Sequence, residues 1–260
     1  MIGFLLKKNL YDIWDNLLRI VLINLGFLAL VAIPVFIPGL LGKLINSQIL
    51  EIALSAIGIL LCSVYLSAAA HCLKKISDYG KFGFADFLNS LKIAWPAGLV
   101  MGAFIFLLFL IVSIVIPFYF TMESSVGLVI AALIFWLTIF ALLSFQFYFT
   151  VCVRLGTNLK KAIKKCMLIS LDNSGFAVFI LLLNTIAIII SVVLAFLFPG
   201  PAGVLLFLDQ ALRLRLLKYD WLEANPDENR KKIPWDELLV EEREKTGDRS
   251  FRNFIFPWKD

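Results

Sequence analysis

Four polar side chains interrupt stretches of the chain that are otherwise apolar: Asn24, Gln146, Asn184 and Asp209. A carboxylate inside a membrane is costly, so it usually faces protein or water and marks a path for ions, protons or polar substrates. The three amides can add hydrogen bonds to such a ligand, or they can instead hold neighbouring helices together. Asp209 can likewise pair with Arg213, one helical turn further on. The group therefore predicts either a substrate-binding cavity centred on Asp209 or a set of interhelical contacts.

A second group consists of four lysines within six positions, Lys160, Lys161, Lys164 and Lys165. They occupy one flank of a helical pattern over residues 158–172, which is typical of a basic amphipathic helix lying in the membrane interface. Nucleic-acid binding is the rival interpretation. No aromatic stacking platform or nucleic-acid-binding fold motif accompanies the lysines, so we expect no nucleic-acid partner.

Patterns typical of enzymes and metal sites are missing from the sequence. There is no Walker A motif, no GxSxG, no HExxH and no pair of carboxylates within an apolar stretch. The four cysteines and the single histidine show no metal-ligand spacing. We therefore expect no enzymatic activity, no metal, no cofactor and reduced thiols.

The elements that position these residues are predicted to be membrane helices. The chain of 260 residues is 61% hydrophobic with a mean hydropathy of +0.91, whereas soluble domains are about 45–50% apolar. A hydrophobic stretch of roughly 20 residues is long enough to cross a bilayer. The prediction is an all-α, polytopic membrane domain over residues 1–218, followed by a cytoplasmic tail, 219–260. Six spans are expected, at 17–38, 49–70, 95–120, 126–151, 176–198 and 202–217.

Charge sets the predicted orientation of these spans. If the N-terminus is cytoplasmic, Lys43 is the only one of the 24 basic residues that falls in an outer connection. This bias follows the positive-inside rule and places both termini in the cytoplasm. Counted from the inner ends at 1.5 Å per residue, the four polar residues lie about 7–12 Å deep. The cavity that they predict would open towards the cytoplasm.

Amphipathic segments begin near residues 4, 84 and 158, each just before an odd-numbered span. We expect three interfacial helices on the cytoplasmic side. In the first, Lys8–Asp12 and Asp15–Arg19 are predicted ion pairs at i,i+4 spacing. The recurrence fits either a threefold internal repeat or the ordinary periodicity of six spans with basic inner loops.

The tail ends in FRNFIFPWKD, with aromatic residues at Phe251, Phe254, Phe256 and Trp258. So many aromatic side chains in a solvated segment indicate a contact. They can dock on the protein's own cytoplasmic face, insert in the membrane interface, or bind a membrane or cytoplasmic protein partner.

The order of several motifs resembles the YesL-like family of bacterial membrane proteins. These are NLLRIVLINLGFLALVAIPVFIPGLLG, FGFADFLNSLKIAW, the basic helix, and the Pro-Gly-Pro turn before a short last span. The resemblance covers about residues 4–218. Ile37-Pro38 departs from the threonine-containing version of the first motif.

The resemblance implies a multi-pass protein of the bacterial plasma (inner) membrane. It also implies an accessory or transport-related component of carbohydrate uptake, because members accompany carbohydrate-uptake and glycan-degradation systems. It supplies no catalytic residues. The alternative is a non-transporting scaffold, an assembly or regulatory partner acting through its cytoplasmic helices and tail.

Overall fold

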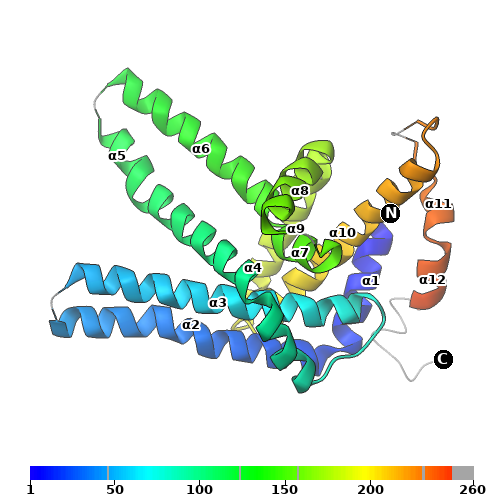
Figure 1. The fold of residues 1–260 in the computed structure, drawn as a ribbon, viewed down its shortest axis with the longest axis horizontal. Coiled ribbons are helices and arrows are strands. Elements are labelled where there is room, and N and C mark those ends of the chain that lie inside the picture. The colour runs from blue at the N-terminus through cyan, green and yellow to red at the C-terminus, as the bar shows by residue number, and fades with distance from the viewer. Residues whose placement is uncertain (46, 123, 157, 230–231, 248–260) are drawn as a thin grey trace.

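The computed structural model describes residues 1–45, 47–122, 124–156, 158–229 and 232–247, and these residues form helices without any strand. Figure 1 shows their arrangement. The helices are α1 (Ile2–Asp15), α2 (Leu17–Ile45), α3 (Gln48–Ser77), α4 (Phe84–Leu110), the π-helical segment η1 (Ile111–Val115), α5 (Ile116–Thr121), α6 (Ser125–Phe145), α7 (Tyr148–Leu155), α8 (Leu159–Asp172), α9 (Ser174–Val193), α10 (Gly200–Ala224), α11 (Trp235–Leu238) and α12 (Val240–Thr246).

Five helical segments of the described chain are long and apolar enough to cross a membrane. They are Leu17–Leu41, Gln48–Ser77, Phe84–Thr121, Ser125–Leu155 and Ser174–Val193. An all-helical, multi-pass membrane protein is therefore the architecture that the chain supports. The sixth predicted span, 202–217, is not among the five. It lies in α10, whose charged residues Asp209, Arg213 and Arg215 lower its hydropathy.

Two long hairpins, α2–α3 and α4–α6, extend from a common base and diverge towards their tips (Figure 1). Small residues allow α4 to approach α3 closely, as is common between membrane helices. At Gly98 an added Cβ atom would collide with the backbone of Val64 on α3. The outer surfaces of both hairpins carry exposed apolar side chains, such as Ile49 and Val126, as contact with lipid requires.

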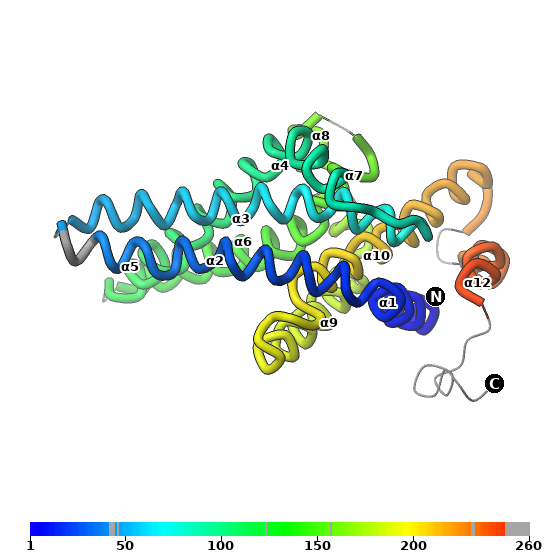
Figure 2. The backbone as a smooth tube through the Cα atoms, turned by 90° about the horizontal axis from the view of Figure 1, so that it is seen from below, coloured from blue at the N-terminus to red at the C-terminus, as the bar shows by residue number. Residues whose placement is uncertain are grey.

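The base of the hairpins contains the best-buried part of the molecule. Leu73 of α3, Tyr148 of α7, and Leu206 and Leu212 of α10 are all fully buried there. Both α1 and α12 lie at this same end, away from the hairpin tips (Figure 2). We call it the inner end, because the positive-inside rule predicts that it faces the cytoplasm; the orientation itself stays a prediction.

The turn between α9 and α10 lies close to the inner end. Asn24 of α2 donates hydrogen bonds to the carbonyl oxygens of Leu197 and Pro199, and it accepts one from the Ala202 amide. At 1.5 Å per residue, Asn24 is about 10 Å from the first residue of α2. The Pro199-Gly-Pro201 turn, predicted to reach the outer surface, therefore packs against the inner third of α2. This is why α10 does not start as a full crossing helix.

The other end of α9 is also fixed at the inner end. Gln146, which follows α6, donates a hydrogen bond to the Ala177 carbonyl oxygen in the first turn of α9. In Figure 2 α9 is seen nearly end-on, whereas α2 and α3 run across the view. α9 therefore runs in a different direction from the two long hairpins.

The predicted interfacial helices are found in part. α1 and α8 are separate helices, but residues 84–95 are continuous with the third span, because α4 runs unbroken from Phe84 to Leu110 through Pro96. α10 continues to Ala224, past the domain boundary predicted at 218/219. The aromatic residues Phe251, Phe254, Phe256 and Trp258 lie outside the described residues. Whether α1 and α8 lie in a membrane interface stays a prediction.

Candidate functional site: a polar cluster at the inner end

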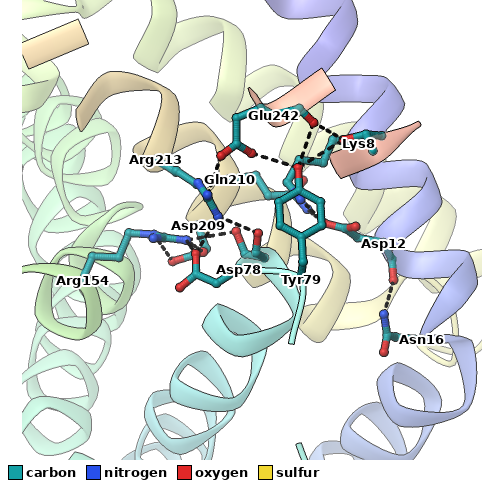
Figure 3. Close-up of polar contacts among 12 residues, drawn as sticks. Lys8, Asp12, Asn16, Asp78, Tyr79, Arg154, Asp209, Gln210, Arg213 and Glu242 are labelled. Atoms are coloured by element: carbon teal, nitrogen blue, oxygen red, sulfur yellow. Dashed lines mark hydrogen bonds and ion pairs between the residues drawn. The ribbon is translucent and has the colours of Figure 1, made fainter. Parts of the chain in front are cut away.

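Charged and polar side chains from five helices and one connection meet at the inner end (Figure 3). We call this set the inner polar cluster; it comprises Lys8, Asp12, Ser77, Asp78, Tyr79, Arg154, Asp209, Gln210, Arg213 and Glu242. Its three positive charges, on Lys8, Arg154 and Arg213, are nearly balanced by four negative charges. The anions are Asp12, Asp78, Asp209 and Glu242. Buried charges are tolerated only when they are paired in this way.

Asp209 and Arg154 form the centre of the cluster. Arg154 Nε donates to Asp209 Oδ1 at 2.8 Å, and Arg154 Nη2 donates to Asp209 Oδ2. Only 2% of the Asp209 surface is exposed. This two-pronged geometry is the strong form of an arginine–carboxylate contact. It joins α10 to α7 at a place from which water is largely excluded.

Both arginines of the cluster also bind the end of α3. Arg154 Nη2 lies 3.0 Å from Ser77 Oγ and 3.1 Å from Asp78 Oδ1. Arg213 Nη1 donates to the Ser77 carbonyl oxygen at 2.8 Å and to Asp78 Oδ1 at 2.6 Å. The last carbonyl groups of a helix carry partial negative charge, so cations are favoured there. The end of α3 is therefore the point where α7 and α10 are held together.

Tyr79 connects the cluster to α12. Its hydroxyl donates to Glu242 Oε2 at 2.9 Å, while Arg213 Nη2 donates to the other carboxylate oxygen, Oε1. Tyr79 has a left-handed backbone with φ of 61°, which is unusual for a residue other than glycine and persists when surrounding contacts hold it. Burial raises the pKa of the Tyr79 hydroxyl, so it remains a hydrogen-bond donor.

Lys8 and Asp12 of α1 complete the cluster. Lys8 Nζ is 2.8 Å from Asp12 Oδ2, so the predicted i,i+4 pair is confirmed. The same oxygen accepts from Gln210 Nε2 at 2.6 Å, and Lys8 Nζ lies 3.5 Å from the centre of the Tyr79 ring. Burial lowers the pKa of Lys8 and raises the pKa of Asp12, while each charge partly offsets the shift of the other. The Lys8–Asp12 part of α1 thus packs on protein, not on water.

A further buried cation lies near the start of α9. The Arg215 guanidinium is stacked on Phe176, with 3.6 Å between Cζ and the ring centre, and Trp235 lies 5.8 Å away. Its Nε has no hydrogen-bond partner among the described residues. Stacking on aromatic rings compensates part of the cost of burying this charge. Arg215 therefore links α10 to α9 and to the start of α11.

The four residues predicted to line one cavity have different partners. Asp209 binds Arg154 and not Arg213. Asn24 binds the α9–α10 turn, and Gln146 donates to the carbonyl oxygens of Leu143 and Ala177. Asn184 is buried, and its Oδ1 has no hydrogen-bond partner in the described part of the chain. These hydrogen bonds fit the interhelical alternative rather than a shared cavity. Substrate binding by the four residues stays a prediction.

The four lysines at positions 160, 161, 164 and 165 lie on α8 away from its buried face. Lys160, Lys161 and Lys164 are exposed, while Ala162 and Cys166 are fully buried. Lys165 lines a cavity of about 580 Å³ between α8 and α10. The amphipathic pattern of this segment is therefore present in the structure; its contact with lipid headgroups remains a prediction.

Six residues of the cluster were not singled out by the sequence: Ser77, Asp78, Tyr79, Arg154, Gln210 and Glu242. One signal could have found Arg154. It is a lone cation at the end of one apolar stretch, and Asp209 is a lone anion in another. Because buried charges need partners of opposite sign, the two could have been paired. No sequence signal joins Tyr79 to Glu242, which is 163 positions away.

We expect Asn24→Leu to lower the free energy of unfolding by about 2 kcal/mol, because it leaves buried backbone groups of the α9–α10 turn without partners. Thr185→Val is the matched control, since the exposed Thr185 hydroxyl donates to the Leu181 carbonyl oxygen of its own helix. Thermal unfolding in detergent measures both variants. Equal losses for the two would show that Asn24 does not hold the turn.

No family model, curated protein or solved structure matches this chain. The resemblance to the YesL-like family therefore stays a prediction that rests on its quoted motifs.

Proposed function

We propose that this chain is a non-transporting membrane scaffold that acts as an assembly or regulatory partner through its inner end. The observation that carries the proposal is the docking of α12 on the inner polar cluster. Glu242 is only 6% exposed, and its carboxylate is held by Arg213 of α10 and by Tyr79 at the end of α3. A segment far along the chain is thereby made part of the membrane domain.

The cluster supports a structural role because its charges are used within the protein. Arg154 and Arg213 each bind two carboxylates, and removing one partner from such a buried set costs about 3–5 kcal/mol. The contacts keep α1, α3, α7, α10 and α12 in one arrangement. A surface that is already ordered loses less entropy when a partner binds it. The inner end is thus suited to serve as a platform.

The face of α12 that points away from the cluster is the part of the platform offered to a partner. Val240, Glu241, Arg243 and Glu244 are exposed there, while Glu242 and Thr246 are buried on the opposite side. Residues that are three or four positions apart lie on the same face of a helix. A partner that binds this face would therefore depend on the docking of α12 without contacting Glu242.

The proposal is tested by a photo-crosslinking amino acid placed at Val240 in native membranes. We expect one adduct of defined mass, which is lost in Glu242→Ala and kept in Lys245→Ala. Glu242 bonds to Arg213 and Tyr79, whereas Lys245 forms a weak surface pair with Glu241 and is not among the residues of the exposed face named above. The purified protein in liposomes should show no carbohydrate flux above empty liposomes.

The competing function is carbohydrate uptake, which the resemblance alone implies. Carbohydrate flux that is abolished by Asp209→Asn in a folded, inserted protein would overturn the scaffold proposal and support transport. Absence of any adduct at Val240 would contradict the platform as well, whatever the outcome of the flux measurement.

A further inference from the structure

An apolar groove lies between α2, α3 and the start of α4. Its volume is about 520 Å³, and its lining includes Arg19 and Leu22 of α2, Tyr65 of α3, Phe82, Phe84 and Phe87. Ligand sites commonly have volumes of about 300–1,000 Å³, with mostly apolar walls and few polar groups. This groove has that composition, and Arg19 is the one charged group among the described residues that line it.

The walls of the groove are held by specific contacts. Gly26 has no side chain, so the Tyr65 ring can lie directly against α2; an added Cβ would collide with the Tyr65 hydroxyl. That hydroxyl donates to the Ile23 carbonyl oxygen at 2.9 Å, and the Tyr65 and Phe87 ring centres are 5.0 Å apart. The groove is therefore formed by packed side chains of α2, α3 and α4 and not by a loop alone.

Arg19 is only partly satisfied by protein. Its Nε donates to the Phe82 carbonyl oxygen at 3.2 Å, and its Nη1 donates to Asn16 Oδ1 at 2.9 Å. Both acceptors are uncharged, and these bonds use only part of the donor fork of a guanidinium. Lys81, next to Phe82, adds an exposed cation in the same connection. Arg19 therefore gives the polar end of the groove a cation that can bind an anion.

The position of the groove indicates what fills it. Leu22 is 58% exposed, Phe84 77% and Leu18 73%, so this flank of α2 and α4 presents apolar side chains outwards. Arg19 lies in the first turn of the first membrane-crossing candidate, Leu17–Leu41, where the headgroup layer is expected. An apolar groove in lipid is filled by hydrocarbon, and an arginine at its interfacial end matches a phosphate in charge and geometry.

We propose that this groove binds one anionic phospholipid, with the phosphate at Arg19 and an acyl chain along Leu22, Tyr65 and Phe87. Basic pockets between membrane helices on the cytoplasmic side are known to hold anionic headgroups. The net negative charge selects such a lipid over phosphatidylcholine, whose choline cation offsets the phosphate. The proposal does not depend on the scaffold function.

The test uses the full chain in phosphatidylcholine vesicles that carry a trace of photoactivatable phospholipid with the reactive group in its acyl chain. Labelled peptides are identified by mass spectrometry. We expect photoactivatable phosphatidylglycerol to label residues 19–26 or 82–87 about fivefold more than photoactivatable phosphatidylcholine, the ratio for roughly one interfacial charge contact. Arg19→Gln should reduce this ratio to about one, while Arg19→Lys keeps most of it.

Matched controls separate the groove from the rest of the surface. Leu22→Trp should fill the groove and abolish labelling, whereas Leu18→Trp, one turn away and outside the groove, should leave it unchanged. Lys161→Gln on α8 removes an exposed charge elsewhere and should not change the lipid ratio. Equal labelling by the two lipids in the unmodified protein would overturn the proposal, and so would labelling confined to other segments. If Leu22→Trp does not fold, the three charge variants still decide the question.

Discussion

Arg154→Met is expected to lower the free energy of unfolding by about 3–5 kcal/mol, because it leaves the Asp209 carboxylate buried without its charge partner. Arg154 donates two hydrogen bonds to Asp209, the Ser77 hydroxyl is a further hydrogen-bond partner, and Asp209 is 2% exposed. No other arginine or lysine of the described residues forms an ion pair with it. Reversible unfolding in mixed micelles measures the loss.

Arg243→Met is the matched control for this change. Arg243 also pairs with an aspartate, Asp236, at 2.7 Å, but the two side chains are 49% and 91% exposed. Exposed pairs contribute about 0–1 kcal/mol, so the control should be nearly neutral. The double variant Arg154→Met/Asp209→Leu should recover most of the stability, since it removes the unpaired charge. A loss no larger for Arg154→Met than for Arg243→Met would show that the buried pair does not hold α7 to α10.

Glu242→Ala is expected to release α12 and raise the rate of trypsin cleavage after Arg243 and Lys245 by about 10–100-fold. Hydrogen bonds to charged groups contribute about 1.5–3 kcal/mol, and cleavage within a helix follows the population of its locally opened form. Glu242 loses its bonds to Arg213 and Tyr79 in this variant. Mass spectrometry of the fragments measures the rate at each site.

Glu241→Ala is the control for cleavage, because it likewise removes an acid on the N-terminal side of both cleavage sites. Glu241 is 86% exposed and lies 3.8 Å from Lys245, a weak surface pair. Its cleavage rate should stay close to that of the unmodified protein. Tyr79→Phe should give an intermediate rate, since Arg213 still binds Glu242. Equal rates for Glu242→Ala and Glu241→Ala would mean that α12 is held by other contacts.

Properties that depend on composition and on neighbours along the chain were predictable from the sequence. Apolar stretches of membrane length predicted helices at five places where the structure has them. The Lys8–Asp12 pair followed from i,i+4 spacing alone and is found at 2.8 Å. Such features need no knowledge of how distant helices pack, because helical geometry places the residues concerned on one face.

The depth of α10 was not predictable in this way. A short apolar stretch after Pro199-Gly-Pro201 fits a sixth crossing helix as well as a shallow one. Hydropathy gives the free energy of transferring each residue into lipid, but it does not say where the helix begins relative to the bilayer. Asn24 decided the matter by binding Leu197, Pro199 and Ala202. Because the turn is held beside the inner third of α2, α10 begins near the inner end and not at the outer surface.

The partners of the buried charges were decided only by the tertiary structure. Asp209 had Arg213 one turn away in sequence, yet it binds Arg154 at a separation of 55 positions, and Arg213 binds Glu242 instead. Periodicity shows which side of a helix is polar but not which helix will cover it. Burial demands that every charge find a counter-charge, and the choice among those available depends on where packing of α3, α7, α10 and α12 places them.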